Sequence, residues 1–306
     1  MNLVLTIGIC IVLLFIFVQL VTFLLEQLSK FLLVLRFPNG PISLLFQVLG
    51  LGVPFAIISI LFARNAITEQ LVAGTAVGYA IFSLLGIPAL LGFRHKGTIR
   101  TVISSQSLAS VLFGGFAFIL AAIDQRISSL EGAVLLVLCL AYVWTGFSTP
   151  SSQPLPHRTE LSIGRIFGLV AVVVAVIVCT YYTAIFTANA AAQLTDGAVI
   201  GLTLIAALLV LPLFVFAWKN AQHTQTVIQT AAHNAMMILL GWVGLFAIFT
   251  PLVISPFVLV LGLLFLFIAI FCFFLIGREV IVLNRFTAIA LVCLLLLYAI
   301  KLFFNS

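Results

Sequence analysis

Apolar runs of about 20 residues, separated by charged residues or by Pro and Gly, restrict the fold of this chain more than any other feature. Inside a lipid bilayer no water satisfies backbone N–H and C=O groups, so a chain crosses as helices or as a closed barrel. Runs of this length fit helices, because a barrel strand needs only about ten residues. Hydrophobic residues make up 64% of the chain and charged residues 7%. The sequence therefore predicts an all-α membrane protein.

The apolar runs predict about ten transmembrane helices. Their approximate ranges are 3–25, 41–63, 70–93, 102–123, 131–147, 164–187, 197–218, 227–249, 251–276 and 286–304. The eighth and ninth runs are separated only by Thr250 and Pro251, with no charge between them. An even number of helices places both termini on the same side of the membrane.

The distribution of Lys and Arg among the predicted loops indicates the orientation, because basic residues resist translocation and stay in the cytoplasm. Ten of them fall on the side away from the termini: Lys30, Arg36, Arg94, Lys96, Arg100, Arg158, Arg165, Lys219, Arg278 and Arg285. Arg64, Arg126 and Lys301 fall on the other side. We therefore expect a multi-pass protein of the bacterial inner (plasma) membrane with both termini outside the cytoplasm. His95 and Lys96 are expected to contact lipid headgroups from the cytoplasmic side.

A polar segment rich in Pro and Ser lies at the midpoint of the chain. We interpret residues 148–163 as a cytoplasmic linker loop between a first five-helix half, residues 1–147, and a second half, residues 164–306. Because five is an odd number, the second half enters the membrane in the opposite orientation. The predicted fold is two inverted five-helix repeats, an arrangement that recurs in secondary transporters.

Two pairs of segments support an internal repeat. The segments are VLGLGVPF (48–55) and LVAGTAVGYAIFSLLG (71–86) in the first half, and GLTLIAALLVLPL (201–213) and VIQTAAHNAMMILLG (227–241) in the second. Pro54 and Pro212 each remove one backbone donor from an apolar helix and free a carbonyl. Such groups need neighbours or a wet cavity in a membrane, so prolines at matching places favour a midplane site over two packed kinks.

These segments resemble the motifs of the cation/calcium exchanger superfamily, the sodium/calcium and proton/calcium antiporters. That family has ten helices in two inverted halves, with a motif similar to A-L-G-T-S-L-P-E on the second helix of each half and to G-N-x-x-G-S-N on the third. The first half matches at Gly50, Val53, Pro54, Gly74 and Gly78. The second half matches at Gly201, Leu202, Thr203, Ala206, Pro212 and Asn234.

The chain departs from this family where the family binds its ion. Phe55 and Leu213 stand where the resemblance implies an acid after each proline. The two positions before the prolines that carry hydroxyls in the family are Leu51 and Gly52, and Leu209 and Val210. All seven acids fall at or near predicted helix ends: Glu26, Glu69, Asp124, Glu131, Glu160, Asp196 and Glu279. Because Ca²⁺ takes six to eight oxygen ligands with carboxylates among them, we expect neither calcium exchange of the family's kind nor a metal site.

In the absence of acids, the polar side chains near the position of the family's ion site are neutral. The candidate substrate or ion site comprises Gly52, Pro54, Thr75, Tyr79, Ser83, Thr203, Pro212, Gln229, Thr230, His233 and Asn234. Spacings of four place Thr75, Tyr79 and Ser83 on one helix face, Gln229 with His233 on another, and Thr230 with Asn234 on a third. Such a set could bind a neutral or weakly polar ligand, with His233 as a proton carrier. The alternative is that these side chains hydrogen-bond between helices, as is usual in membrane bundles.

Two functions follow from this pattern. One is a secondary transporter with an altered substrate, and the other is a transport-inactive exchanger relative that serves as a membrane scaffold or as a subunit of a complex. Expected partners are membrane lipids, a small solute or monovalent cation, and other membrane proteins, but no nucleic acid, because the basic residues form no stripe. The sequence has no CxxC pair, Walker loop, HExxH or GxSxG motif, so we expect no catalytic residues, no cofactor and no enzymatic activity.

Overall fold

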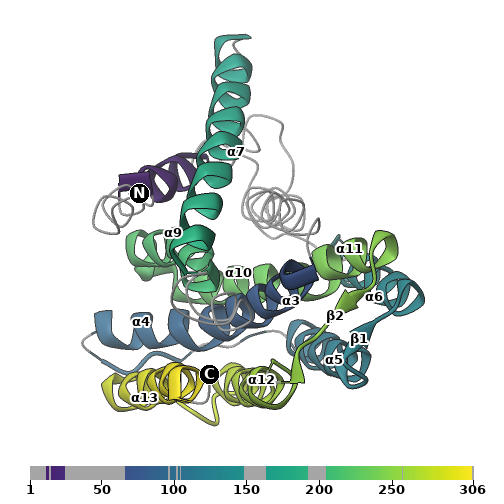
Figure 1. Ribbon diagram of the computed structural model, residues 1–306. Coiled ribbons are helices and arrows are strands. Elements are labelled where there is room, and N and C mark those ends of the chain that lie inside the picture. Colours follow the sequence, from purple (N-terminus) through teal and green to yellow (C-terminus); the bar gives the residue numbers. More distant parts are fainter. Residues whose placement is uncertain are drawn as a thin grey trace.

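The computed structural model of the protein describes residues 12–13, 15–24, 66–95, 97–100, 103, 105–147, 163–191, 205–256 and 258–304. Helices dominate these residues (Figure 1). Gly52, Pro54 and Thr203 of the candidate site lie outside them, as does residue range 148–162 of the predicted linker.

The elements follow the predicted apolar runs. They are α3 (Ala66–Ile81), η1 (Phe82–Gly86), α4 (Ile87–Arg94), α5 (Ser105–Ala122), β1 (Arg126–Ile127), α6 (Ser129–Phe147), α7 (Ile163–Ala191), α9 (Ala206–Lys219), η3 (Ala221–His223), α10 (Thr224–Met236), η4 (Met237–Trp242), α11 (Val243–Phe249), β2 (Leu252–Val253), η5 (Val258–Gly262), α12 (Leu263–Gly277) and α13 (Arg285–Phe304). Residues 15–24 are also helical. η1, η4 and η5 are π-helical, and η3 is a 3₁₀ turn.

Four continuous helical segments of the described residues are long and apolar enough to cross a bilayer: Val72–Arg94, Ala221–Phe249, Leu259–Gly277 and Arg285–Leu302. Shorter apolar helices occupy five further predicted runs: Phe15–Leu24, Leu108–Ala122, Ser129–Val143, Val170–Tyr182 and Ala206–Lys219. The run predicted at 41–63 lies outside the described residues. The expected break between the eighth and ninth runs is present, because α11 ends at Phe249 and the short strand β2 follows. The total of ten helices stays a prediction.

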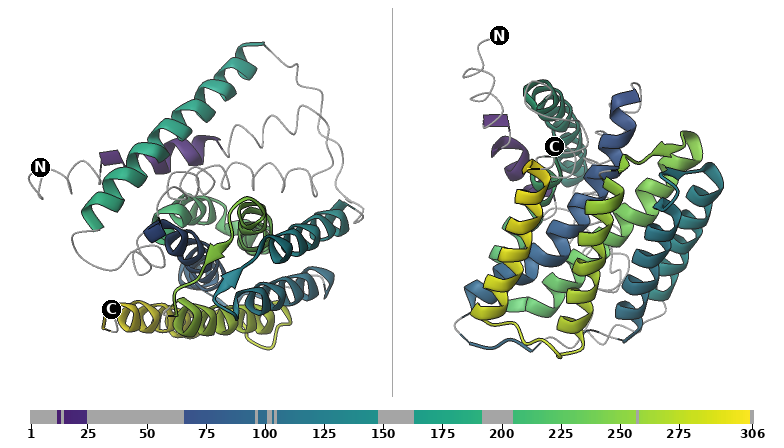
Figure 2. Two further views of the ribbon diagram at one scale, coloured as in Figure 1. Left: turned by 45° about the vertical axis from the view of Figure 1, so that its right-hand side comes forward. Right: turned by 60° about the horizontal axis from the view of Figure 1, so that its bottom comes forward.

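Two continuous helices run through the middle of the bundle, α3–η1–α4 and α10–η4–α11 (Figures 1 and 2). α4 packs against α13 and α9, while α11 packs against α6. α12 contacts both α5 and α3. α7 rises away from the bundle in Figure 1, and apolar side chains such as Phe167 and Val174 are exposed on it. Exposed apolar side chains of this kind suit contact with lipid tails.

Short main-chain bridges join the connections between helices. β1 pairs antiparallel with β2, with Ile127 opposite Leu252. An isolated bridge joins Ile99 and Leu283, whose N–H and C=O groups exchange hydrogen bonds of 2.8 and 3.2 Å. Within a few residues of the end of α5, Gln125 adopts a positive φ of 67°, and after α12 Glu279 adopts a positive φ of 59°. The connection after α5 and the connection after α12 therefore share a left-handed residue close to the end of the helix.

The helices that follow these two connections also begin in the same way, with a reciprocal cap. The N–H of Ser128 donates to Glu131 Oε2 at 2.7 Å, and the N–H of Glu131 donates to Ser128 Oγ at 3.3 Å. Before α13, the N–H of Asn284 donates to Thr287 Oγ1 at 2.8 Å, and the N–H of Thr287 donates to Asn284 Oδ1 at 2.9 Å. Each cap satisfies two backbone donors that a helix start otherwise leaves unpaired.

Small residues allow two helix pairs to approach closely. A Cβ added at Gly132 of α6 would lie 2.7 Å from Ala247 Cβ and 2.8 Å from the carbonyl oxygen of Gly244, both on α11. A Cβ added at Gly92 of α4 would lie 3.0 Å from Ala288 Cβ of α13. In lipid, the hydrophobic effect does not drive helices together. Small residues at helix crossings stabilise the pair instead, because they let the two backbones pack in van der Waals contact.

Candidate functional site

The candidate site lies on two helices that share an unusual backbone feature. α3 continues into α4 through the π-helical segment η1, and α10 continues into α11 through the π-helical segment η4. η1 packs against α10, and η4 packs against α3, so the two π segments lie at a reciprocal crossing. Such segments are rare and are found frequently at functional sites.

Alignment of the two π segments places candidate residues at equivalent positions. If Gly86 is aligned with Gly241 without gaps, Thr75 is paired with Thr230 and Tyr79 with Asn234. This register differs by one residue from the one implied by the exchanger motif, which places Ala80 opposite Asn234. The two registers differ because one aligns the π-helical segments of the backbone, whereas the other aligns motif residues that match only in part.

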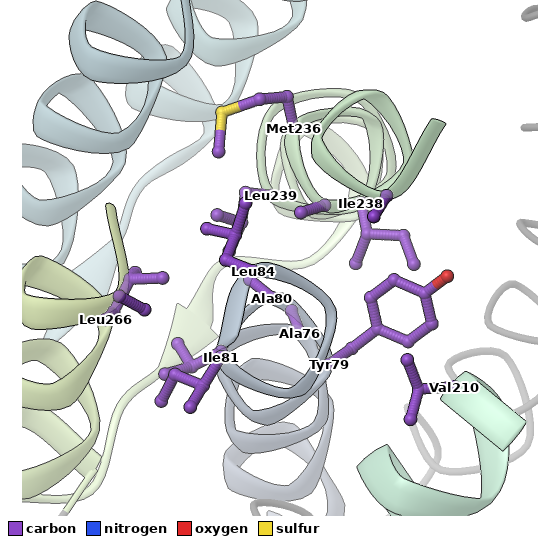
Figure 3. Packing of buried hydrophobic residues seen from close by; sticks show 14 of the residues in the cluster. Ala76, Tyr79, Ala80, Ile81, Leu84, Val210, Met236, Ile238, Leu239 and Leu266 are labelled. Carbon is purple, nitrogen blue, oxygen red and sulfur yellow. The ribbon is translucent and has the colours of Figure 1, made fainter. Parts of the chain in front are cut away.

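Tyr79 and Ser83 lie one turn apart on the helix that contains α3 and η1, and both are fully buried. Figure 3 shows the Tyr79 ring between Ile238 of η4 and Val210 of α9, with its hydroxyl oxygen directed away from α3. The Ser83 hydroxyl is near enough to interact with that of Tyr79. Neither hydroxyl, however, makes a hydrogen bond of good geometry to the described part of the chain.

Asn234 is a third buried polar side chain, on α10, which packs against both α3 and η1. Its side chain is 1% exposed, and neither Nδ2 nor Oδ1 has a hydrogen-bond partner among the described residues. Asn234 lies about one turn before Ile238, and residues so spaced share a helix face. Because Ile238 lies beside the Tyr79 ring in Figure 3, this face of α10 and η4 is the one directed at Tyr79.

These unpartnered atoms are energetically unfavourable in an empty, dry bundle. A buried donor or acceptor that loses its partner costs about 1–3 kcal/mol. Tyr79, Ser83 and Asn234 together contribute four such atoms. The cluster of Tyr79, Ser83 and Asn234, hereafter the polar cluster, is therefore the part of the candidate site with free capacity to bind a ligand or water.

Other candidate residues have local structural roles. The Thr230 hydroxyl donates to the carbonyl oxygen of Thr226 at 2.8 Å, a bond within its own helix that leaves little donor capacity for a ligand. The His233 ring packs on Tyr142 of α6 with ring centroids 5.1 Å apart. Thr75 is fully buried and Gln229 is half-buried.

Pro212 lies inside α9 and is buried, as the sequence predicts for a helix-breaking residue within an apolar helix. A proline at this position removes the hydrogen bond that would reach the carbonyl of Leu208. Leu213, at the position where the exchanger motif has an acid, is fully buried. α9 therefore brings apolar side chains, Val210 among them, to the wall of the polar cluster (Figure 3).

The acids whose side chains the structure describes lie outside the polar cluster. Glu131 caps α6, and Asp124 accepts a hydrogen bond of 3.3 Å from the N–H of Arg126 in the same connection. Within the described ranges, no three His, Cys, Asp or Glu side chains come together in a group that could hold a metal ion.

The structure gives His95 a protein partner that the sequence did not predict. His95 Nε2 lies 2.8 Å from the carbonyl oxygen of Ala221 and 3.3 Å from Thr224 Oγ1. The neighbouring Arg94 guanidinium lies over the Trp218 ring, 4.4 Å from its centroid. The end of α4 is thus fastened to the turn between α9 and α10. Sequence reasoning missed this contact because no local pattern reports which helix ends meet.

Comparison with known proteins identifies the fold of this chain. No family model and no curated protein sequence matches this chain. Among solved structures, native YfkE superposes with a TM-score of 0.70 and 15% identity, covering 98% of this chain and 92% of that one. The sodium-calcium exchanger NCX_Mj, soaked with 2.5 mM Na⁺ and 1 mM Sr²⁺, superposes with a TM-score of 0.66 and 15% identity, covering 97% of this chain and 98% of that one. The chain therefore has the fold of these two proteins over nearly its whole length, and with its long apolar helices it is a multi-pass membrane protein.

Proposed function

We propose that this protein is a secondary transporter that uses the exchanger fold for a substrate other than calcium. The observation that carries the proposal is the polar cluster, whose four unpartnered buried atoms come from two crossing helices. A protein that served only as a scaffold would gain stability from apolar side chains at these positions, because unsatisfied buried polar atoms are costly.

We further propose that residues 1–147 and 164–306 are inverted repeats. Such repeats would suit a transporter, because alternating access is a motion of one repeat against the other. Three observations support a repeat. The π segments η1 and η4 have equivalent positions, the connections after α5 and α12 both pass through a positive φ, and reciprocal caps open both α6 and α13.

Charge argues against calcium as the substrate. From residue 70 to residue 93, and throughout α10, η4 and α11, the sequence has no acid or base other than His233. A divalent cation entering the polar cluster would lose hydration without a carboxylate to replace it. The neutral hydroxyls and the amide suit a weakly hydrated ligand better.

The second candidate function is a transport-inactive scaffold or a subunit of a membrane complex. The fully buried Leu213 favours it, because an apolar side chain stands where the exchanger motif has an acid. A flux measurement distinguishes the two candidate functions, because a transporter moves a solute across the membrane and a scaffold does not.

The test is flux in proteoliposomes that contain the full chain, with sodium and proton gradients imposed in turn. We expect no sodium-driven calcium uptake above that of protein-free vesicles, and calcium binding no tighter than millimolar by calorimetry. We also expect measurable flux of another small solute or of a monovalent cation, reduced in Asn234→Leu. Micromolar calcium affinity that is lost in Asn234→Ala would contradict the altered substrate, and the absence of all flux would favour the scaffold.

A further inference from the structure

We infer that the polar cluster binds a small neutral solute that carries a hydrogen-bond donor beside an acceptor, of the amide or urea class. This inference rests on the proposed transport function and specifies its substrate. It follows from the kinds of atoms that are left unpartnered, from the absence of charge near them on the described helices that carry or flank them, and from the apolar side chains beside them.

The unpartnered atoms comprise both donors and acceptors. The Asn234 carboxamide offers two N–H donors and one carbonyl acceptor, and each hydroxyl, of Tyr79 and of Ser83, can donate once and accept. A primary amide presents the complementary pair, a carbonyl and an adjacent N–H₂, on one rigid plane. It can therefore form two parallel hydrogen bonds with the Asn234 side chain.

A cation fits this set of atoms less well. Hydroxyl groups can rotate their protons away from a cation, but the two N–H donors of Asn234 Nδ2 are fixed and cannot coordinate one. A cation held by Oδ1 would leave these buried donors unsatisfied. An anion held by Nδ2 would leave Oδ1 unsatisfied in the same way, so a ligand with both kinds of group satisfies Asn234 best.

Among the described residues, the helices that carry or flank the polar cluster supply no nearby charge that would offset dehydration of an ion. α9 is uncharged from Ala206 to Trp218, and α10, η4 and α11 carry only the His233 imidazole, which packs on Tyr142. Val210 and Ile238 flank the Tyr79 ring in Figure 3. Apolar walls with a few convergent polar groups are typical of sites for small neutral molecules, whereas a buried ion needs a partner charge.

The experiment measures entry of acetamide and urea into proteoliposomes by light scattering after an osmotic step, together with uptake of labelled sodium. We expect the wild-type protein to accelerate acetamide and urea entry over protein-free vesicles. Tyr79→Phe removes one hydroxyl and should reduce this rate about fivefold, in line with one hydrogen bond. Asn234→Leu, which removes both kinds of group, should abolish it.

Thr180→Val is the matched control, because Thr180 is also a buried hydroxyl in a helix but is already bonded to the carbonyl of Val176 at 2.6 Å. Its acetamide rate should equal that of the wild type. Asn234→Gln keeps the carboxamide and should retain partial flux if the variant folds, which separates loss of the site from loss of the fold. If sodium uptake responds to Asn234→Leu while acetamide and urea do not enter, the inferred substrate class is overturned and the transport function stands. If none of the three solutes enters, the inferred substrate class is overturned, and the transport function is decided by the wider flux measurement described above.

Discussion

His95 Nε2 lies 2.8 Å from the carbonyl oxygen of Ala221, across more than a hundred residues of sequence. Because a carbonyl can only accept, the imidazole tautomer with its proton on Nε2 donates this bond. Together with the Arg94–Trp218 contact, it ties the end of α4, in the first half, to the start of the second π-containing helix. The relative position of the two helices that carry the polar cluster is thereby fixed at one end of the bundle.

Replacement of His95 by Ala should therefore lower stability. The loss of one partly buried hydrogen bond amounts to about 1 kcal/mol, which corresponds to a decrease of roughly 2–4 °C in the melting temperature of a chain of this size. Thermal unfolding in detergent measures the change. His223→Ala is the control, because the His223 side chain is exposed, and it should leave the melting temperature unchanged. Equal effects of the two substitutions would contradict a specific role of His95.

The reciprocal cap before α6 should stabilise the first turn of that helix. Removal of a capping side chain costs about 0.5–2 kcal/mol, so Ser128→Ala should lower the melting temperature and speed amide exchange near residue 131. Asn284→Ala should have the same effect at the start of α13, because its cap has the same pattern. The control is Ser129→Ala, at an exposed neighbouring position. If exchange does not change in either capped helix, the caps do not hold these helix starts.

A larger side chain at Gly132 should separate α6 from α11. Its added atoms would meet the carbonyl oxygen of Gly244, which belongs to the backbone and cannot turn aside. We expect Gly132→Leu to yield little monodisperse protein in gel filtration after solubilisation. Gly168→Leu is the matched control, because a Cβ at Gly168 of α7 has no atom within 4 Å, and it should behave as the wild type. Normal behaviour of Gly132→Leu would show that the two helices need not be in contact.

The orientation predicted from the Lys and Arg distribution can be tested with reporter fusions. Alkaline phosphatase, which is active only outside the cytoplasm, should be active when fused after residue 306. A fluorescent protein that matures in the cytoplasm should be fluorescent when inserted at residues 150–160. The reverse pattern would contradict the predicted orientation. Phosphatase activity after residue 306 without fluorescence at residues 150–160 would contradict an odd number of helices in the second half.

The sequence by itself determined the class of the protein and the places of its helices. Each apolar run that falls in the described residues contains a helix, because hydrophobicity and the backbone's need for internal hydrogen bonds in lipid are properties of local segments. Local sequence also located Pro212 inside its helix, and it singled out Tyr79, Ser83 and Asn234 as polar residues in apolar surroundings.

Tertiary structure alone decided which of those polar residues have free hydrogen-bonding capacity. Thr230 and Asn234 lie on the same helix face, yet the first bonds to its own helix, while both amide atoms of the second find no partner among the described residues. The π segments and the His95–Ala221 contact were likewise invisible in the sequence. The physical reason is that burial, hydrogen-bond satisfaction and helix crossings depend on residues far apart in the chain, whereas hydropathy and prolines act within a few residues.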